Sequence, residues 1–248
     1  MIETTEDAFL GGSLQLLQPK SGYRAGADPV LLASAVRARS GESVLELGCG
    51  VGVALCCLLH RVPGIHGVGL ERDPEMTVLA KQNLAKNQLS ADVLHGDIAY
   101  LPEELKQSMF DHVIANPPFF DRKASTPAQT PNREHGRGED TPFDVWIDVA
   151  ARRLRPGGYL TLIQRAARLS ETLSFMGDRL GSIEIVPLTS RAGRDAENII
   201  VIARKGGRTA LRLHFPVILH DGKHHDRDRD SYSEQAQSIL RHGGPLVI

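Results

Sequence analysis

The stretch Ser43-Val-Leu-Glu-Leu-Gly-Cys-Gly-Val-Gly52 joins a short apolar run to three alternating glycines. Residues 43–47 favour a β-strand, and residues 53–60, which follow the glycines, favour a helix. Glycines between a strand and a helix let the backbone turn tightly and approach a ligand closely. The spacing G-x-G-x-G differs from the G-x-G-x-x-G of dinucleotide-binding proteins, so by itself it indicates either a ligand loop or a tight structural turn.

Strand-like and helix-like segments continue to alternate after this loop, which is typical of βαβ units and a parallel sheet. Residues 182–188 and 199–204 are two strands with no helix between them, which indicates an antiparallel hairpin that closes the sheet. We therefore predict an α/β three-layer sandwich whose seven-stranded sheet has six parallel strands and one antiparallel strand. The other expected strands are 43–47, 66–70, 91–95, 112–115 and 159–164, the expected helices are 53–60, 74–87, 142–154 and 170–180, and residues 210–219 look strand-like.

Capping residues predict where several helices begin and end. Asp73-Pro-Glu75 opens a helix, with Asp as the cap, Pro at the first helical position and Glu at the positive end of the dipole. Gly181 is the expected stop of the helix before it. The last helix is expected to begin at Ser231 or Ser233, in a possible capping box Ser231-Tyr-Ser-Glu234, and to end at Gly243.

Two acidic residues follow the next two predicted strands. Glu71 stands about 20 residues after the glycine loop, where an acid can bind both hydroxyls of a ribose. Asp97, in Gly96-Asp-Ile98, can accept a hydrogen bond from the exocyclic amine of an adenine. Because ligands of such sheets bind at the carboxyl ends of the strands, the glycine loop and the two acids predict one nucleoside site.

The fourth predicted strand ends in Asn116-Pro-Pro-Phe-Phe120. Two prolines stiffen this loop and fix the direction of the carbonyl groups. The amide oxygen of Asn116 and the carbonyl oxygen of Pro117 can both accept from one planar NH2 group, and Phe119 can stack on a heteroaromatic ring. Together they would hold a nitrogen with its lone pair aimed at a methyl donor.

Composition narrows the function classes. The 248 residues carry 29 Lys and Arg against 30 Asp and Glu, a net charge of −1, which excludes a globally basic nucleic-acid binder but not a local basic face. Three cysteines cannot build a disulfide framework, and we expect them to be packing residues in a reducing compartment. The acidic amino terminus does not look like a signal peptide, and no apolar run has the length of a membrane span. We therefore expect a cytoplasmic protein without a membrane partner.

These motifs resemble those of class I S-adenosylmethionine-dependent methyltransferases that act on a planar nitrogen. The resemblance rests on Glu46-Leu-Gly-Cys-Gly-Val-Gly52, the acid after the second strand, Gly-Asp after the third and Asn-Pro-Pro-Phe after the fourth. With Leu17-Gln-Pro-Lys-Ser-Gly-Tyr-Arg-Ala-Gly-Ala-Asp-Pro-Val-Leu-Leu-Ala33, they are similar to the bacterial tRNA-valine adenine-N6 methyltransferase family. This family methylates the adenosine beside the anticodon, and the similarity extends from Gly11 to Ile248.

The resemblance implies one Rossmann-like methyltransferase domain, with S-adenosylmethionine as the cofactor and tRNA as the partner. It implies a core of residues 41–205, a carboxy-terminal extension of residues 206–248, and an amino-terminal segment of residues 1–40 that caps the cofactor. The expected cofactor-binding residues are Glu46, Gly48, Gly50, Gly52, Glu71, Asp97 and Ile98, with Tyr23, Arg24 and Asp28 from the cap. The expected catalytic residues are Asn116, Pro117, Pro118 and Phe119.

Basic residues near the last motif are candidates for contacts with RNA phosphates. They are Arg122, Lys123, Arg133 and Arg137, together with Arg152, Arg153, Arg155, Arg165 and Arg168 in an acid-free stretch. The alternative is a set of solvated arginines on unrelated faces. His220, Asp221, His224, His225 and Asp226 favour a polar hairpin tip over a metal site, and we expect no metal.

Three other functions share these motifs. A protein-glutamine or small-molecule nitrogen methyltransferase would use the same Asn-Pro-Pro-Phe motif as a clamp on its acceptor nitrogen. A guanine-N2 methyltransferase of ribosomal RNA would do the same. A non-catalytic RNA chaperone that binds the cofactor is a third alternative, against which the intact Asn-Pro-Pro-Phe motif argues. The loops of residues 132–139 and 221–230 belong to none of the motifs.

Overall fold

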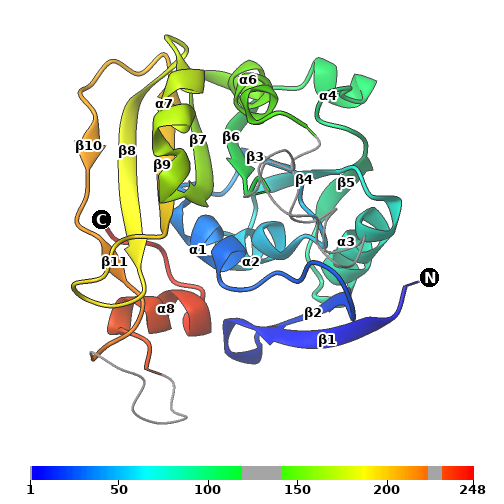
Figure 1. Ribbon diagram of the computed structural model, residues 1–248. Helices are drawn as coiled ribbons and strands as arrows, with labels where there is room; N and C mark the ends of the chain where they lie inside the picture. The colour runs from blue at the N-terminus through cyan, green and yellow to red at the C-terminus, as the bar shows by residue number, and fades with distance from the viewer. Residues whose placement is uncertain (1, 119–140, 223–230) are drawn as a thin grey trace.

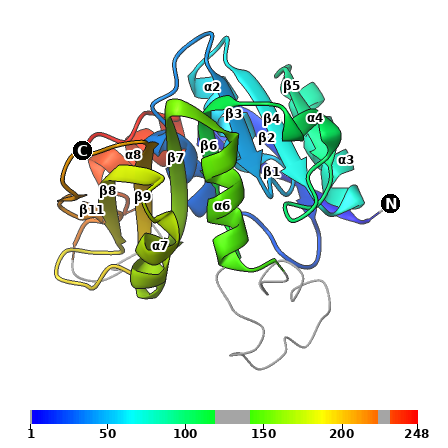
Figure 2. The ribbon, with the colours of Figure 1, turned by 90° about the horizontal axis from the view of Figure 1, so that it is seen from above.

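The computed structural model describes residues 2–118, 141–222 and 231–248. Within them a mixed β-sheet lies between two layers of helices (Figures 1 and 2). Two apolar clusters, one on each face of the sheet, form the core. The expected three-layer sandwich is therefore confirmed. One layer holds α1 (Asp28–Ala35), α2 (Val53–Arg61), α3 (Pro74–Lys86) and, beside α1, α8 (Glu234–His242); the other holds α4 (Glu103–Lys106), α6 (Phe143–Arg153) and α7 (Leu169–Met176).

In the described residues, the sheet has one antiparallel strand among seven main strands. That strand is β9, which runs against both of its neighbours, β7 and β8. Two strands of two residues each, β10 (Arg212–Leu213) and β11 (Val217–Ile218), pair in parallel with the outer edge of β8. The predicted seven-stranded pattern is confirmed, with these short strands added. The main strands follow the order β8 (Leu180–Thr189), β9 (Asn198–Lys205), β7 (Leu154–Arg165), β6 (Phe110–Ala115), β3 (Ser43–Leu47), β4 (His66–Glu71) and β5 (Ala91–His95).

The chain reverses its direction of travel across the sheet next to β3. It runs from β3 outward to β4 and β5, and then crosses to β6 on the other side of β3. Because these strands are parallel, their carboxyl ends lie along one edge of the sheet. In open α/β sheets, ligands bind at that edge beside the reversal, which is where the sequence motifs lie.

Most helix ends agree with the capping signals. The Asp73 side chain accepts from the backbone N–H groups of Glu75 and Met76 at 2.8 and 3.2 Å, and so caps α3 as predicted. Ser233, the second of the two expected starts, caps α8 through a 3.2 Å bond from Ala236 N–H. The expected stop of α7 at Gly181 is wrong. The helix ends at Met176 because Gly177 leaves the helical backbone with a φ of 53°.

The first 35 residues contain elements that the alternating pattern does not predict. Strands β1 (Thr4–Phe9) and β2 (Leu14–Pro19) form a hairpin closed by the short helix η1 (Leu10–Gly12). The hairpin lies against α3, where the Asn83 amide accepts from Leu17 N–H at 2.7 Å and donates to Leu17 C=O at 3.0 Å. Seven of the eight residues of α1 are buried, so this helix lacks the polar face that gives a helical period.

The other differences between the predicted and the observed elements are smaller. The turn expected at residues 155–158 lies within β7, which begins at Leu154 with an irregular register against β6. The strand-like residues 210–219 are reduced to β10 and β11. Among the described helices, none combines the length and the apolar character that crossing a bilayer requires.

Candidate active site

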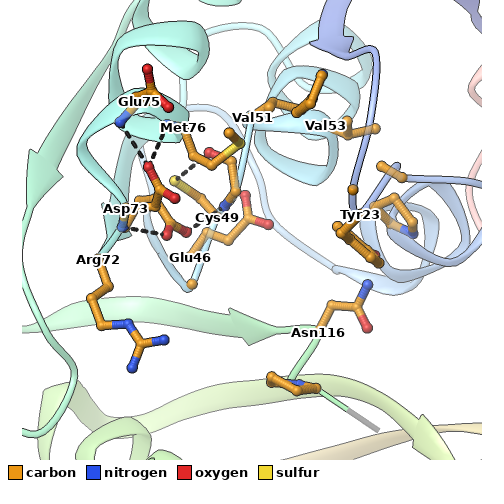
Figure 3. A pocket seen from close by; sticks show the side chains of 18 of the residues that line it. Tyr23, Glu46, Cys49, Val51, Val53, Arg72, Asp73, Glu75, Met76 and Asn116 are labelled. Carbon is orange, nitrogen blue, oxygen red and sulfur yellow. Dashed lines mark hydrogen bonds between the residues drawn. The ribbon is translucent and has the colours of Figure 1, made fainter. Parts of the chain in front are cut away.

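A cavity of about 1230 Å³ opens at the carboxyl ends of the parallel strands. Its wall contains residues from the loop after β3, the ends of β4 and β7, the loops after β5 and β6, and the segment before α1 (Figure 3). These are the positions to which the sequence assigns a nucleoside site and a nitrogen clamp. Of the expected site residues, the wall includes Tyr23, Arg24, Glu46, Gly48, Gly50, Glu71, Asp97, Ile98, Asn116, Pro117 and Pro118.

The glycine loop is packed against an aromatic side chain that the sequence analysis missed. A Cβ atom on Gly48 would lie 2.5 Å from the ring edge of Trp146, and Gly48 has a φ of +64°. Trp146 belongs to α6 and also lines the cavity. Gly52 lies outside the cavity wall and serves instead as the amino-terminal cap of α2, with a φ of 82°.

We expect Gly48→Ala to lower the free energy of unfolding by about 2–4 kcal/mol. The new methyl group would strain the left-handed backbone and displace the Trp146 ring. Gly50→Ala is the matched control, because Gly50 also has a positive φ, of +54°, but a Cβ there meets nothing within 4 Å. We expect it to cost about 1–2 kcal/mol. Urea unfolding of both variants checks the difference, and equal losses would contradict the role of the Trp146 contact.

Glu71 is held in place by backbone groups. Its two carboxylate oxygens accept from Gly50 N–H at 2.7 Å and from Asp73 N–H at 2.8 Å. Burial raises the pKa of this carboxyl, while the bonds from Asp73 and Gly50 act against the shift. The glycine loop and the end of β4 are thus joined through one side chain, whose remaining acceptor positions are available to a ligand in the cavity.

Glu46, the acid that precedes the glycines, is 3% exposed. One of its oxygens accepts from Leu55 N–H at 2.9 Å. Burial raises the pKa of Glu46 to about 8, the Leu55 bond opposes the rise, and the nearby charge of Glu71 adds to it. At neutral pH this carboxyl is therefore largely protonated, and a cationic ligand in the cavity would favour its ionisation.

This raised pKa predicts a pH dependence of stability. In the folded chain Glu46 keeps its proton up to a pH of about 8, whereas an unfolded chain releases it near the ordinary value of 4.5. The unfolded state then binds fewer protons, so the free energy of unfolding falls as the pH rises through this window. Glu46→Gln removes the effect. We expect its stability relative to wild type to rise by up to about 1.4 kcal/mol per pH unit between these values, whereas parallel profiles would contradict the assignment.

Asp97 and Ile98 follow β5 and form another part of the wall. The Asp97 carboxylate accepts from Ala99 N–H at 2.8 Å, which fixes its direction at the start of the loop. Ile98 is 7% exposed and belongs to the apolar cluster under the cavity. A carboxylate beside an apolar surface fits a flat heterocycle that carries an exocyclic amine.

The loop after β6 brings Asn116, Pro117 and Pro118 to the same cavity. The Pro118 carbonyl accepts from the Arg168 guanidinium at 3.5 Å, and Arg168 is itself held by Glu171 at 2.7 and 3.0 Å. Arg168 also lies over the Phe143 ring, 4.5 Å from its centroid. Arg168 is a candidate RNA contact by its sequence position, but its described contacts anchor the loop after β6. Phe119, the last residue of the motif, lies outside the described residues.

The residues expected to cap the cofactor have different surroundings. Arg24 lines the cavity, but its side chain also bonds Thr5 Oγ1 at 2.5 Å, the Pro19 carbonyl at 3.0 Å and the carboxylate of Asp7. Asp28 starts α1 outside the cavity wall and accepts from Asn198 at 3.2 Å. Tyr23 lines the cavity, as Asn116 does.

The acid-free arginine stretch does not gather on one face. Arg155 is the second residue of β7 and Arg165 is the last, so the two lie near opposite ends of this strand. The interpretation as arginines on unrelated faces is favoured. Arg122, Lys123, Arg133 and Arg137 lie outside the described residues. The acidic partners are Asp148 for Arg152, Asp111 for Arg155, Glu197 for Arg165 and Glu171 for Arg168, while Arg153 donates to the carbonyls of Leu105, Lys106 and Ser108.

The cysteines are buried packing residues, as expected. Burial raises the pKa of Cys49 and Cys57 well above the ordinary thiol value, and that of Cys56 to about 12. In the described part of the chain, no three His, Cys, Asp or Glu side chains are grouped as metal ligands. His220 bonds Ser231 Oγ at 3.1 Å and stacks on Tyr232, whereas His224, His225 and Asp226 lie beyond the described residues.

Comparisons with known proteins identify the family and the fold. Residues 26–191 match the family model of the methyltransferase small domain. A tRNA1(Val) (adenine(37)-N6)-methyltransferase of Porphyromonas gingivalis is 30% identical over 196 residues, which cover 73% of this chain and 76% of the relative. A predicted O-methyltransferase from Agrobacterium tumefaciens has a similar structure, with a TM-score of 0.71, 26% identity, and coverage of 88% of this chain and 98% of that one. A Thermus thermophilus 16S rRNA N2 G1207 methyltransferase shares the fold, with a TM-score of 0.56, 24% identity, and coverage of 82% and 50%.

Proposed function

The chain belongs to the methyltransferase small domain family, and we propose that it transfers the methyl group of S-adenosylmethionine to the N6 atom of an adenine in tRNA. One observation carries the proposal. The Asn116-Pro-Pro118 clamp opens into the same cavity as the glycine loop, Glu71 at the end of β4 and Asp97 after β5. The name of the Porphyromonas gingivalis relative supports adenine 37 of tRNA1(Val) as the target.

The cavity fits a methyl donor and an acceptor base together. Its volume of about 1230 Å³ exceeds the roughly 300–1000 Å³ of a pocket for one small molecule. Gly48 and Gly50 present backbone without side chains at its wall. Glu71 would bind the ribose hydroxyls of S-adenosylmethionine, and Asp97 its adenine amine. When bound, this donor supplies an electrophilic methyl group on a sulfonium sulfur.

The clamp acts on the acceptor. The Asn116 amide oxygen and the Pro117 carbonyl oxygen accept from the N6 amino group and shift the nitrogen toward tetrahedral character. Its lone pair forms the new bond to the methyl carbon as the bond from that carbon to sulfur breaks. The electron pair of the broken bond stays on the sulfur, and the nitrogen then loses its proton to water. Positioning of this kind can supply about 7–11 kcal/mol of the barrier reduction.

We further propose that the chain works as one domain, with residues 1–40 as a cap, residues 41–205 as the core and residues 206–248 as an extension. Tyr23 and Arg24 at the cavity wall, and Gln18 beside them, support the capping role. The tRNA substrate implies that the enzyme acts in the cytoplasm.

The test is incubation of the protein with labelled S-adenosylmethionine and bulk bacterial tRNA, followed by digestion to nucleosides. We expect the label in N6-methyladenosine. Label in N2-methylguanosine would favour the guanine enzyme. An unlabelled tRNA pool, with label entering a release-factor glutamine instead, would favour the protein methyltransferase. An inactive protein that still binds S-adenosylmethionine and tRNA would favour the non-catalytic chaperone.

A further inference from the structure

Three arginines of the described residues line the cavity, and Arg165 is the one beside the clamp. Arg24 is held by the β1–β2 hairpin, and Arg72 follows Glu71 at the end of β4. Arg165 is the last residue of β7, and β7 pairs with β6, the strand whose end carries Asn116 (Figure 1). The transfer step proposed above gives Arg165 no role, although it belongs to the same cavity wall.

The order of the strands divides the edge of the sheet at the clamp. The ends of β3, β4 and β5, where the glycine loop, Glu71 and Asp97 lie, are on one side of β6. The end of β7, with Arg165, is on the other side. Because the methyl donor would occupy the first side, a nucleotide whose base is held at Asn116 has its ribose and phosphates toward β7.

Arg165 also lies farther out along the strand direction than Asn116. Ala115 of β6 pairs with Leu162 of β7, so Asn116 is one residue beyond this pair and Arg165 is three residues beyond it. At about 3.3 Å per residue, the difference is about 6–7 Å toward the outside of the sheet edge. A base that leaves its stack and enters a pocket keeps its sugar and phosphates outside. Arg165 is therefore placed at the level of the backbone of the RNA and not at the level of the base.

The acidic partner of Arg165 is one that a phosphate can replace. The Arg165 guanidinium lies 3.4 Å from the Glu197 carboxylate, and the two side chains are 36% and 84% exposed. Ion pairs this exposed contribute little to stability, and this one is longer than a strong charge-assisted bond. The backbone beside it is fixed, because Ala166 N–H donates to the Glu197 carbonyl at 2.8 Å. Exchange of the side-chain partner therefore leaves the end of β7 in place.

We propose that Arg165 binds a phosphate of the RNA next to the target adenosine, and so holds the nucleotide whose base enters the clamp. This inference rests on the proposed function, and it adds the path of the RNA backbone over the end of β7. A guanidinium matches the charge and the oxygen geometry of a phosphate. An acceptor without a phosphate, such as a glutamine side chain, would leave Arg165 with Glu197.

The first test is Arg165→Gln, with tRNA binding measured by filter binding at several salt concentrations. We expect the Kd of tRNA to rise about three- to tenfold at low salt, and the slope of log affinity against log salt to fall by about 0.7–0.9, the value for one phosphate contact. The Kd of S-adenosylmethionine should stay within about twofold of wild type.

Arg152→Gln is the charge-matched control, because Arg152 is an exposed residue of α6 that pairs with Asp148 at 2.7 Å, outside the cavity wall. It removes one positive charge and should match wild type in tRNA affinity and in slope. Equal slopes for wild type and Arg165→Gln would overturn the inference. The same change in both variants would do so too, because it would assign the effect to net charge.

Glu197→Gln separates a phosphate contact from a structural ion pair. If a phosphate replaces Glu197 on Arg165, this variant removes a competitor and a like charge, and we expect tRNA binding to tighten about two- to threefold. The two variants then act in opposite directions. If the ion pair only stabilises the end of β7, both variants should weaken tRNA binding, and that result would overturn the inference.

Labelled methyl transfer to tRNA by the wild-type protein tests the proposed function separately. Wild-type protein that leaves tRNA unmethylated would overturn the proposed function, and this inference with it. Wild-type protein that methylates tRNA, together with an unchanged salt slope in Arg165→Gln, would overturn the inference alone.

Discussion

Asn116→Ala is expected to lower kcat at least 100-fold while the Kd of S-adenosylmethionine stays within about twofold of wild type. The amide oxygen acts on the acceptor amine, and its removal takes away an interaction that strengthens as the nitrogen becomes tetrahedral. Asn116 lies after β6, whereas the glycine loop, Glu71 and Asp97 lie at the carboxyl ends of β3, β4 and β5. The two halves of the site should therefore separate in a measurement of turnover and a calorimetric measurement of donor binding.

The control for this variant is Asn87→Ala, an asparagine at the end of α3 that bonds Gln15. It tests the loss of an amide outside the cavity, and we expect wild-type turnover from the folded fraction. If Asn116→Ala keeps more than about a tenth of the rate, a loss below roughly 1.4 kcal/mol, Asn116 is not the clamp. If Asn116→Ala loses donor affinity as strongly as turnover, the assignment of Asn116 to the acceptor part of the cavity is wrong.

Glu71→Ala is expected to weaken the binding of S-adenosylmethionine about 10- to 150-fold, which corresponds to about 1.5–3 kcal/mol for charge-assisted hydrogen bonds. The variant loses the proposed contacts to the ribose hydroxyls. It also frees the backbone N–H groups of Gly50 and Asp73, which Glu71 holds at 2.7 and 2.8 Å. Both effects loosen the same part of the cavity and add in one direction. Isothermal titration calorimetry with S-adenosylmethionine measures the change.

Glu104→Ala is the charge-matched control, because this acid lies in α4 and outside the cavity wall. It removes one negative charge and should leave the donor affinity unchanged. Equal affinities for wild type and Glu71→Ala would remove Glu71 from the donor site. Equal losses in both variants would assign the effect to net charge instead of to the contacts at the end of β4.

The central sheet was predictable, because it follows from the local pattern of strand-like and helix-like segments. The alternation between residues 43 and 176 predicts parallel strands, and the missing helix between β8 and β9 predicts their hairpin. Strand ends that carry glycines, an acid and a proline pair then define one edge of the sheet, and the structure brings Glu71, Asp97 and Asn116 to one cavity there.

Contacts between distant segments were not predictable from pattern. Trp146 approaches Gly48 from α6, nearly 100 residues later, and only the missing Cβ reveals why this glycine is needed. Arg168 is paired with Glu171, and this pairing cannot be seen in the composition, which gives only the number of charged residues. The β1–β2 hairpin is stabilised by Asn83 of α3, a tertiary contact that has no local periodicity.

The most direct measurement compares two transcripts of bacterial tRNA-Val, one with adenine at position 37, the position named for the relatives, and one with guanine there. Each is incubated with the protein and labelled S-adenosylmethionine, and the methylated nucleoside is identified. We expect close to one methyl group per adenine transcript, all of it as N6-methyladenosine, and background labelling of the guanine transcript. Equal labelling of both transcripts, or label in any nucleoside other than N6-methyladenosine, would contradict the proposed function.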